Sequence, residues 1–211
     1  VGLELKTTGV LRKTPNYRAK ERLVLTMIDY EAIADESWEN SSFYKKCRLM
    51  LILFYLYAKE VAVIDRKFVI EPLLYEIPSS DVAQIRRDWE LIRQRVLEGK
   101  AHQLSEGDTY YLGACRKGSG GEKEALRKQP FSNERAKARA FSFKQGYVNK
   151  LIEGHIGEGQ SLGVNASVTF EVATQLRFNP FIGQTVEEIS KQLGYYKKKN
   201  KFYYDNLKNL L

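Results

Sequence analysis

The chain has 211 residues, with 34 Lys and Arg against 26 Asp and Glu, giving a formal net charge of +8. Hydrophobic residues make up 43% and aromatic residues 12%, which is enough to form a core and excludes a disordered chain. The two cysteines form no C-x-x-C pattern, so a disulfide framework is excluded and a reducing environment is predicted. Two histidines far apart in sequence argue against a histidine-rich zinc site.

The positive charge is concentrated in three segments. Residues 1–22 carry a net charge of +4, residues 112–150 carry +7 and residues 191–211 carry +5, which leaves the rest of the chain acidic. A clustered excess of cations is typical of proteins that bind a polyanion, most simply nucleic acid. The alternative is a set of solvated basic loops, and charge alone leaves both open.

The N-terminal quarter is expected to be rich in strands. Alternating residues predict strands over 2–8 and 23–28, paired as a hairpin through the basic, turn-rich segment 12–22. A short helix is expected within 36–47. The run 48–57 is apolar on both faces, which is typical of a central buried strand.

The middle of the chain contains the clearest helical pattern. Short strands are expected over 61–64 and 68–75, followed by a helix over 80–98 with Ser80 as its N-cap and Gly99 as its stop. The helix carries one apolar stripe, made of Val82, Ile85, Trp89, Ile92 and Val96.

The remainder continues this mixed pattern. A strand over 109–113 precedes a glycine-rich basic loop at 116–121, and a strand over 139–143 precedes a helix over 145–154. No apolar run is long enough to cross a membrane, and no signal peptide is recognised. Because the chain lacks an initiator Met and starts directly with a strand, we expect it to begin inside a longer protein.

Glu4 and Lys6 are the residues that could carry chemistry. Two positions apart on a strand, their side chains emerge on one face. A carboxylate there can bind Mg²⁺ through oxygen, and a lysine can orient water and stabilise charge on a phosphate. Leu5 between them can add its backbone carbonyl as a metal ligand. Taken alone, the pattern is a weak signal, because charged alternation is routine on the solvent face of a strand.

Seven blocks spread over residues 1–155 carry a family resemblance. They are Val1–Thr7, Lys20–Leu25, Trp38–Lys46, Asp88–Glu90, Glu98–Gly107, Tyr111–Gly118 and Arg139–Lys144. In this order they resemble the MutH family, which contains a mismatch-repair nicking endonuclease and type II restriction endonucleases that cut at GATC. The likeness is greater to the catalytic part of the restriction enzymes.

The resemblance implies an α/β fold with a mixed central β-sheet flanked by helices, the PD-(D/E)xK nuclease core. It implies a catalytic core at 1–155, a linker at 156–167 and a helical extension at 168–211. It also implies Mg²⁺-dependent hydrolysis of double-stranded DNA at GATC, in the bacterial cytoplasm and without a membrane. The residues it assigns are Glu4, Lys6 and Lys46 for catalysis, Glu4 and Leu5 for the metal, and Arg116, Lys117, Gly118, Arg139 and Lys144 for DNA.

Two departures from the family pattern qualify this assignment. The first metal-binding Asp of the family is expected upstream of Val1, and a tyrosine of the mismatch-repair branch is Ser142 here. We therefore expect residues 1–211 alone to cut little or no DNA. The alternative function is a non-cleaving DNA-binding or regulatory module of a MutH-like protein.

Overall fold

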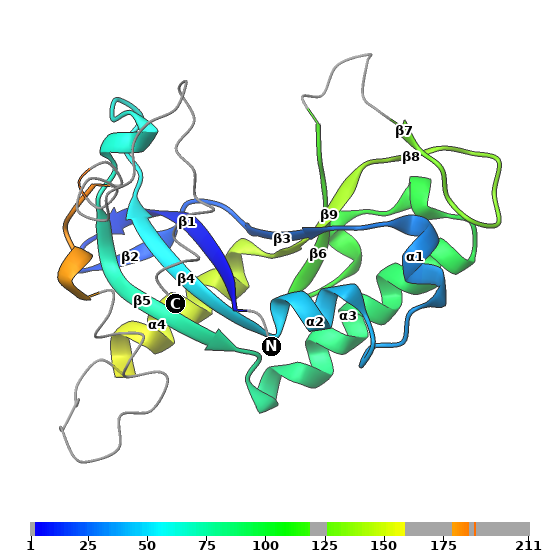
Figure 1. Cartoon of the computed structure of the whole chain (residues 1–211), viewed down its shortest axis with the longest axis horizontal. Helices are drawn as coiled ribbons and strands as arrows, with labels where there is room; N and C mark the ends of the chain where they lie inside the picture. Colours follow the sequence, from blue (N-terminus) through cyan, green and yellow to red (C-terminus); the bar gives the residue numbers. More distant parts are fainter. Residues whose placement is uncertain (1–2, 119–125, 159–178, 186–187, 189–211) are drawn as a thin grey trace. The chain divides into compact units, whose positions relative to one another are not determined.

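The structure, a computed structural model, describes residues 3–118, 126–158, 179–185 and 188 (Figure 1). The chain forms two compact units, each assembled from segments far apart in sequence. The first contains Val1–Glu4, Arg22–Leu49 and Glu76–Val148, and the second contains Leu5–Glu21, Met50–Tyr75 and Asn149–Leu211.

A four-stranded sheet forms the second unit. Its strands, in the order β2-β1-β4-β5, are Asn16–Ala19, Glu4–Lys13, Leu49–Leu56 and Phe68–Glu76. β1 and β2 are antiparallel, with Val10 opposite Ala19. β4 lies between two neighbours and is buried from Met50 to Phe54, which is why its sequence is apolar at consecutive positions rather than alternating.

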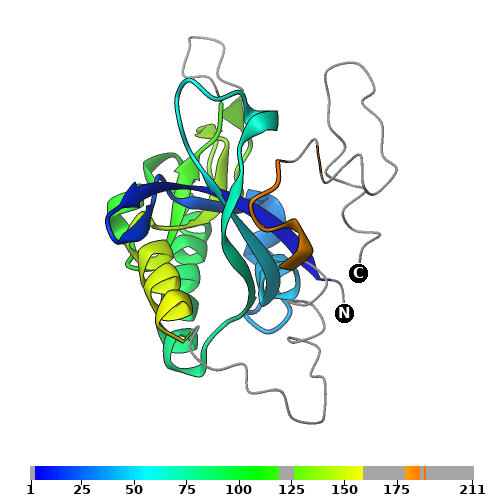
Figure 2. The same ribbon diagram turned by 90° about the vertical axis from the view of Figure 1, so that its left-hand side faces the viewer.

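Helix α4 (Gln145–Glu158) packs beside this sheet (Figure 2). The Ala19 N–H of β2 donates to Asn149 Oδ1 at 2.7 Å, and His155 Nε2 lies 3.0 Å from the Glu71 carbonyl of β5. These two contacts, on opposite edges of the sheet, show that α4 runs across it from β2 to β5. Two short 3₁₀ turns complete the described part of this unit, η1 (Val63–Asp65) and η4 (Asn179–Phe181).

A three-stranded antiparallel sheet forms the centre of the first unit. Its strands, in the order β3-β9-β6, are Leu23–Met27, Arg139–Phe143 and Leu112–Arg116. β9 is the middle strand, and all five of its residues are buried. Beside it, β7 (Leu126–Arg127) and β8 (Ala136–Lys137) form a small antiparallel hairpin.

Helices complete the first unit. They are α1 (Tyr30–Asp35), α2 (Ser42–Cys47) and α3 (Ser79–Leu97), with 3₁₀ turns η2 (Ala101–Gln103) and η3 (Glu106–Asp108). α3 buries the stripe Ile85, Trp89, Ile92 and Val96 at helical spacing. Each such side chain contributes about 1.5–3 kcal/mol through burial. Gly99, at φ +70°, lies just beyond the end of the helix.

The α/β class and several predicted elements are confirmed. The strands at 48–57, 68–75 and 139–143, and the helices at 80–98 and 145–154, all occur within a few residues of their expected bounds. In each unit helices flank a sheet, as the restriction-endonuclease-like prediction requires.

Three local predictions were wrong. The strand at 23–28 does not pair with the N-terminal strand; β1 turns back at Pro15 to pair with β2, and β3 pairs with β9. Residues 61–64 form no strand but lead into η1. Ser80 does not cap α3, because the helix already begins at Ser79 and its N-cap, Pro78, has no side-chain hydrogen bond.

Two predicted segments fall mainly outside the described residues. Of the predicted linker 156–167, residues 156–158 belong to α4 and the rest is not described. Of the predicted helical extension 168–211, residues 179–185 and 188 are described. Among the described residues, no helix is long and apolar enough to cross a membrane.

Candidate active site and DNA-binding loop

Glu4 and Lys46, far apart in sequence, face each other in the first unit. Glu4 begins β1 and Lys46 lies in the last turn of α2, with Lys46 Nζ 3.8 Å from Glu4 Oε1. The Glu4 side chain is 23% exposed and the Lys46 side chain 50%, so both remain accessible to a ligand. The pairing brings together two of the three residues predicted to be catalytic.

The segment before Lys46 explains how so short a helix is held in place. Ser41 is the N-cap of α2: its Oγ accepts from the Tyr44 N–H at 3.0 Å and donates to the Trp38 carbonyl at 2.7 Å. Phe43 and Cys47, four residues apart, are fully buried, so the other side of the helix turns Lys46 outward.

Aromatic packing anchors the same segment. The Trp38 ring lies 5.8 Å from Phe43, 5.0 Å from Tyr44 and 5.9 Å from Trp89 of α3, measured between ring centroids. Both tryptophans are buried and belong to the core. The Trp38–Lys46 block therefore folds as a unit that positions one lysine.

Leu5 and Lys6 follow Glu4 on β1, so Lys6 is on the same side of the strand as Glu4 by the two-residue period. Both residues are half-buried. The Glu4 carboxylate and the Leu5 carbonyl are hard oxygen donors of the type that Mg²⁺ prefers. Among the described residues, however, no group of three or more His, Cys, Asp or Glu side chains converges to hold a metal ion. These residues thus fit part of a magnesium site in chemistry but do not complete one.

The predicted recognition loop begins where β6 ends. Arg116 is the exposed last residue of β6, opposite Arg139 of β9, and the Lys117 N–H donates to the Ala138 carbonyl at 2.8 Å. Gly118 has φ +130°, a backbone conformation that L side chains rarely adopt, so the chain can turn sharply here. The preceding residue, Cys115, is buried and has a free thiol. The rest of the predicted loop, 119–121, lies outside the described residues.

Asp88 is a residue whose role the sequence interpretation missed. It is 1% exposed on α3, and its carboxylate accepts hydrogen bonds from the backbone N–H groups of Tyr110 (2.9 Å), Tyr111 (2.6 Å) and Leu112 (2.8 Å). Gln84 Nε2 donates a fourth bond at 2.9 Å. The carboxylate thereby fixes the segment that enters β6. The available signal was a charged residue beside Trp89 on the buried side of a helix.

Arg139 is placed differently from its expected DNA-facing position. It is 4% exposed, and its guanidinium donates to the Ala114 carbonyl at 2.5 Å and to the Leu104 carbonyl. Burial lowers the pKa of this guanidinium. A side chain enclosed in this way joins β9 to β6 and to the turn at Leu104, so we do not assign a DNA contact to Arg139.

Lys144 is also engaged within the protein. Its Nζ donates to the Thr109 carbonyl, and its methylene chain passes over Gly113, where an added Cβ would lie 3.5 Å from Lys144 Cε. Ser142, which replaces the tyrosine of the mismatch-repair branch, is buried in β9. The structure therefore groups Arg116, Lys117 and Gly118 at one turn after β6, and it holds the half-buried Lys144 against Gly113 and Thr109.

The mixed α/β fold is consistent with the restriction-endonuclease-like class. Residues 1–88 match the family model described as DNA mismatch repair enzyme MutH. The chain is also 36% identical over 203 residues to the type II restriction enzyme Sau3AI of Staphylococcus aureus, an alignment that covers 92% of this chain and 41% of that enzyme. The chain is thus MutH-like and related to a type II restriction enzyme, and it spans about two fifths of that relative's length.

Proposed function

We propose that the chain is the catalytic part of a sequence-specific endonuclease that hydrolyses double-stranded DNA at GATC with Mg²⁺, in the bacterial cytoplasm. The observation that carries the proposal is the 3.8 Å approach of Lys46 to Glu4, because it joins two family-matched residues from separate elements. The similarity to a type II restriction enzyme supports it independently.

Each residue has a distinct role in this proposal. The Glu4 carboxylate and the Leu5 carbonyl would contribute oxygen ligands to a divalent ion, which when bound polarises the scissile phosphate and favours formation of hydroxide. Lys6 orients the attacking water. Lys46 offsets the negative charge that accumulates on the phosphate and, in the absence of DNA, shields the Glu4 carboxylate.

Specific reading of the DNA is assigned to the turn at 116–118. Lys and Arg side chains can donate to guanine O6 and N7 in the major groove. Arg116 and Lys117 follow directly from a rigid sheet, and Gly118 lets the backbone turn close to the bases. We expect these residues to contact the guanines of GATC.

Plasmid cleavage by the full-length protein tests the proposal. In Mg²⁺, Lys46→Ala should cut a GATC-containing plasmid about 10²-fold more slowly than wild type, the usual cost of losing one charge-stabilising group. Glu4→Gln should also cut the plasmid more slowly than wild type, because it removes the proposed carboxylate ligand of the metal. Lys45→Ala is the matched control, because Lys45 is an exposed lysine in the same turn of α2 and should cut at the wild-type rate.

The outcomes separate the two candidate functions. Equal cleavage by wild type, Glu4→Gln and Lys46→Ala would show that these residues are not catalytic. GATC-dependent binding without cleavage in any divalent metal would favour the non-cleaving module. A plasmid lacking GATC should remain intact, and its cleavage would contradict the proposed specificity.

A further inference from the structure

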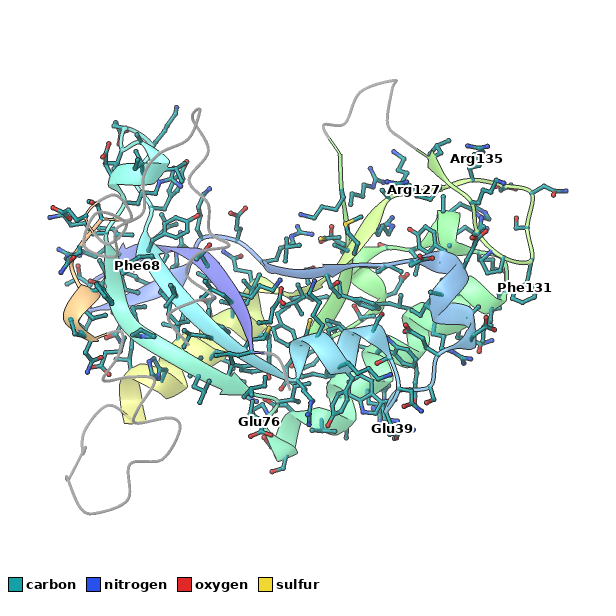
Figure 3. All side chains as sticks on the ribbon, in the orientation of Figure 1. Glu39, Phe68, Glu76, Arg127, Phe131 and Arg135 are labelled. Atoms are coloured by element: carbon teal, nitrogen blue, oxygen red, sulfur yellow. The ribbon has the colours of Figure 1, made fainter. Side chains whose placement is uncertain are left out.

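An unusual arm extends from the first unit beyond the recognition turn. We use the name β7–β8 arm for residues 126–137, which comprise both short strands and the loop between them. Its most exposed apolar side chain is Phe131, at 73% exposure. Figure 3 shows Phe131 on the outer bend of the arm; Arg127 ends β7 and Arg135 immediately precedes β8.

The backbone at Phe131 is held in a conformation that aromatic residues rarely adopt. Its φ is +61°, which costs about 1–2 kcal/mol for a residue with a side chain. Such strain persists only where the surroundings enforce it, and it is frequently associated with function.

Gly99, just beyond the end of α3, makes room for the backbone of Phe131. A Cβ at Gly99 would lie 2.6 Å from the Phe131 carbonyl oxygen and 3.1 Å from Ser132 Cβ, so the arm packs its main chain directly on the glycine. The backbone of Phe131 is therefore packed against α3 while the ring is turned out to solvent.

Gln129 fixes the base of the same loop. It is 5% exposed; its Oε1 accepts from the Ala101 N–H at 2.7 Å, and its Nε2 donates to the Glu134 carbonyl at 2.7 Å. The same Nε2 lies 3.0 Å from His102 Nδ1, and His102 Nε2 lies 3.2 Å from Glu134 Oε2. These contacts hold the loop in one shape before any ligand arrives, which reduces the entropy lost on binding.

The exposed positive charge of the arm indicates a negatively charged partner. Arg127, Lys128 and Arg135 are exposed, and no carboxylate among the described residues pairs with them. The single acidic side chain of the arm, Glu134, faces His102 instead. An apolar tip flanked by unpaired cations is complementary to a DNA groove, where the cations contact phosphates and the tip contacts bases.

We infer that the β7–β8 arm is a second DNA contact, with Arg127, Lys128 and Arg135 on phosphates flanking the recognition sequence and Phe131 as an apolar wedge in the minor groove. The arm is well placed for this role, because the Lys117 N–H donates to the carbonyl of Ala138, immediately after β8. The inference rests on the proposed function, since it requires a duplex held at the recognition turn.

Binding of the full-length protein to a duplex of about 30 base pairs tests the inference. The duplex has a central GATC, Ca²⁺ replaces Mg²⁺ to limit cleavage, and 2-aminopurine is placed at each flanking position in turn. Wild type should raise 2-aminopurine fluorescence at one flanking step, where the wedge unstacks the bases. Phe131→Ala should abolish that signal and bind about tenfold more weakly, whereas Phe131→Leu should retain most of both.

The cations are tested through salt dependence. Arg127→Ala with Arg135→Ala should reduce the slope of log affinity against log salt by about 2, the value for two lost phosphate contacts. Leu91→Ala is the matched control, because Leu91 is an exposed apolar residue on α3, and it should change neither affinity nor slope.

The failure modes are distinguishable. If wild type binds GATC duplexes but Phe131→Ala gives the same affinity and the same fluorescence as Leu91→Ala, the wedge is refuted and the proposed function stands. An unchanged salt slope in the double variant refutes the phosphate contacts in the same way. If wild type binds no DNA, the proposed function and this inference both fail.

Discussion

Replacing Asp88 by Asn should release the start of β6 and weaken DNA recognition. The Asp88 carboxylate accepts four hydrogen bonds, two on each oxygen: Tyr110 and Gln84 donate to Oδ1, and Tyr111 and Leu112 donate to Oδ2. In asparagine one of the two carboxylate oxygens is replaced by an NH₂ group, which donates hydrogen bonds and cannot accept them. In either orientation of the amide, two of the four N–H donors therefore lose their acceptor and face another donor.

The magnitude follows from the bonds lost. A hydrogen bond to a charged group contributes about 1.5–3 kcal/mol, and the site is 1% exposed, so water does not substitute readily. Two lost bonds should therefore lower the free energy of unfolding by about 3–6 kcal/mol. Because Arg116 and Lys117 lie only a few residues beyond Leu112, loosening this segment should also weaken binding to GATC duplexes.

Two measurements on the full-length protein check this expectation. Urea unfolding followed by tryptophan fluorescence gives the stability change, and hydrogen exchange gives the protection of the amides of Tyr110, Tyr111 and Leu112. The control is Arg86→Ala on the same helix, whose exposed ion pairs with Glu39 and Glu90 should contribute less than about 1 kcal/mol. If Asp88→Asn were as stable as Arg86→Ala and kept its amide protection, the assigned role of the carboxylate would be refuted.

Three further changes have defined outcomes. Gly99→Ala should lower the unfolding midpoint by several degrees, because φ +70° and the 2.6 Å approach to a backbone oxygen both oppose a Cβ; an unchanged midpoint would contradict this. Burial raises the pKa of Tyr30 to about 12, so the folded state favours the neutral phenol, and the stability this gives is complete below pH 10 and lost between pH 10 and 12. In the Tyr30→Phe variant, the free energy of unfolding in urea should decrease less between pH 10 and 12 than in wild type, by up to about 2.7 kcal/mol. Arg139→Lys should destabilise by about 2–3 kcal/mol in urea, because an ammonium cannot reach both carbonyls; a change confined to DNA affinity would instead point to a DNA contact.

Elements defined by local pattern were predictable from sequence. In β4 consecutive residues are buried, and in α3 every third or fourth residue is buried. Such short spacings can be recognised within a short stretch of sequence. The candidate pair could be named from sequence because Glu4 and Lys46 occur in blocks that resemble a family. Their 3.8 Å approach required the fold, since 41 residues separate them in the chain.

Interactions between distant segments account for the errors. The pairing of β3 with β9 joins residues more than 100 positions apart, which no local pattern encodes. β6 begins at Leu112 rather than at 109 because the preceding amides bind a carboxylate of α3 instead of a neighbouring strand. The burial of Arg139 was not evident from sequence either, because its acceptors are main-chain carbonyls, which are present in every residue and carry no sequence signal.

The two buried cysteines provide native reporters of local opening. Cys47 immediately follows Lys46 and Cys115 immediately precedes Arg116; both thiols are buried and neither belongs to a disulfide. A thiol-specific reagent can react with either only when its surroundings transiently separate. Labelling rates at the two positions therefore measure how often α2 and the end of β6 open, and the effect of bound DNA on those rates can be followed in the unmodified protein.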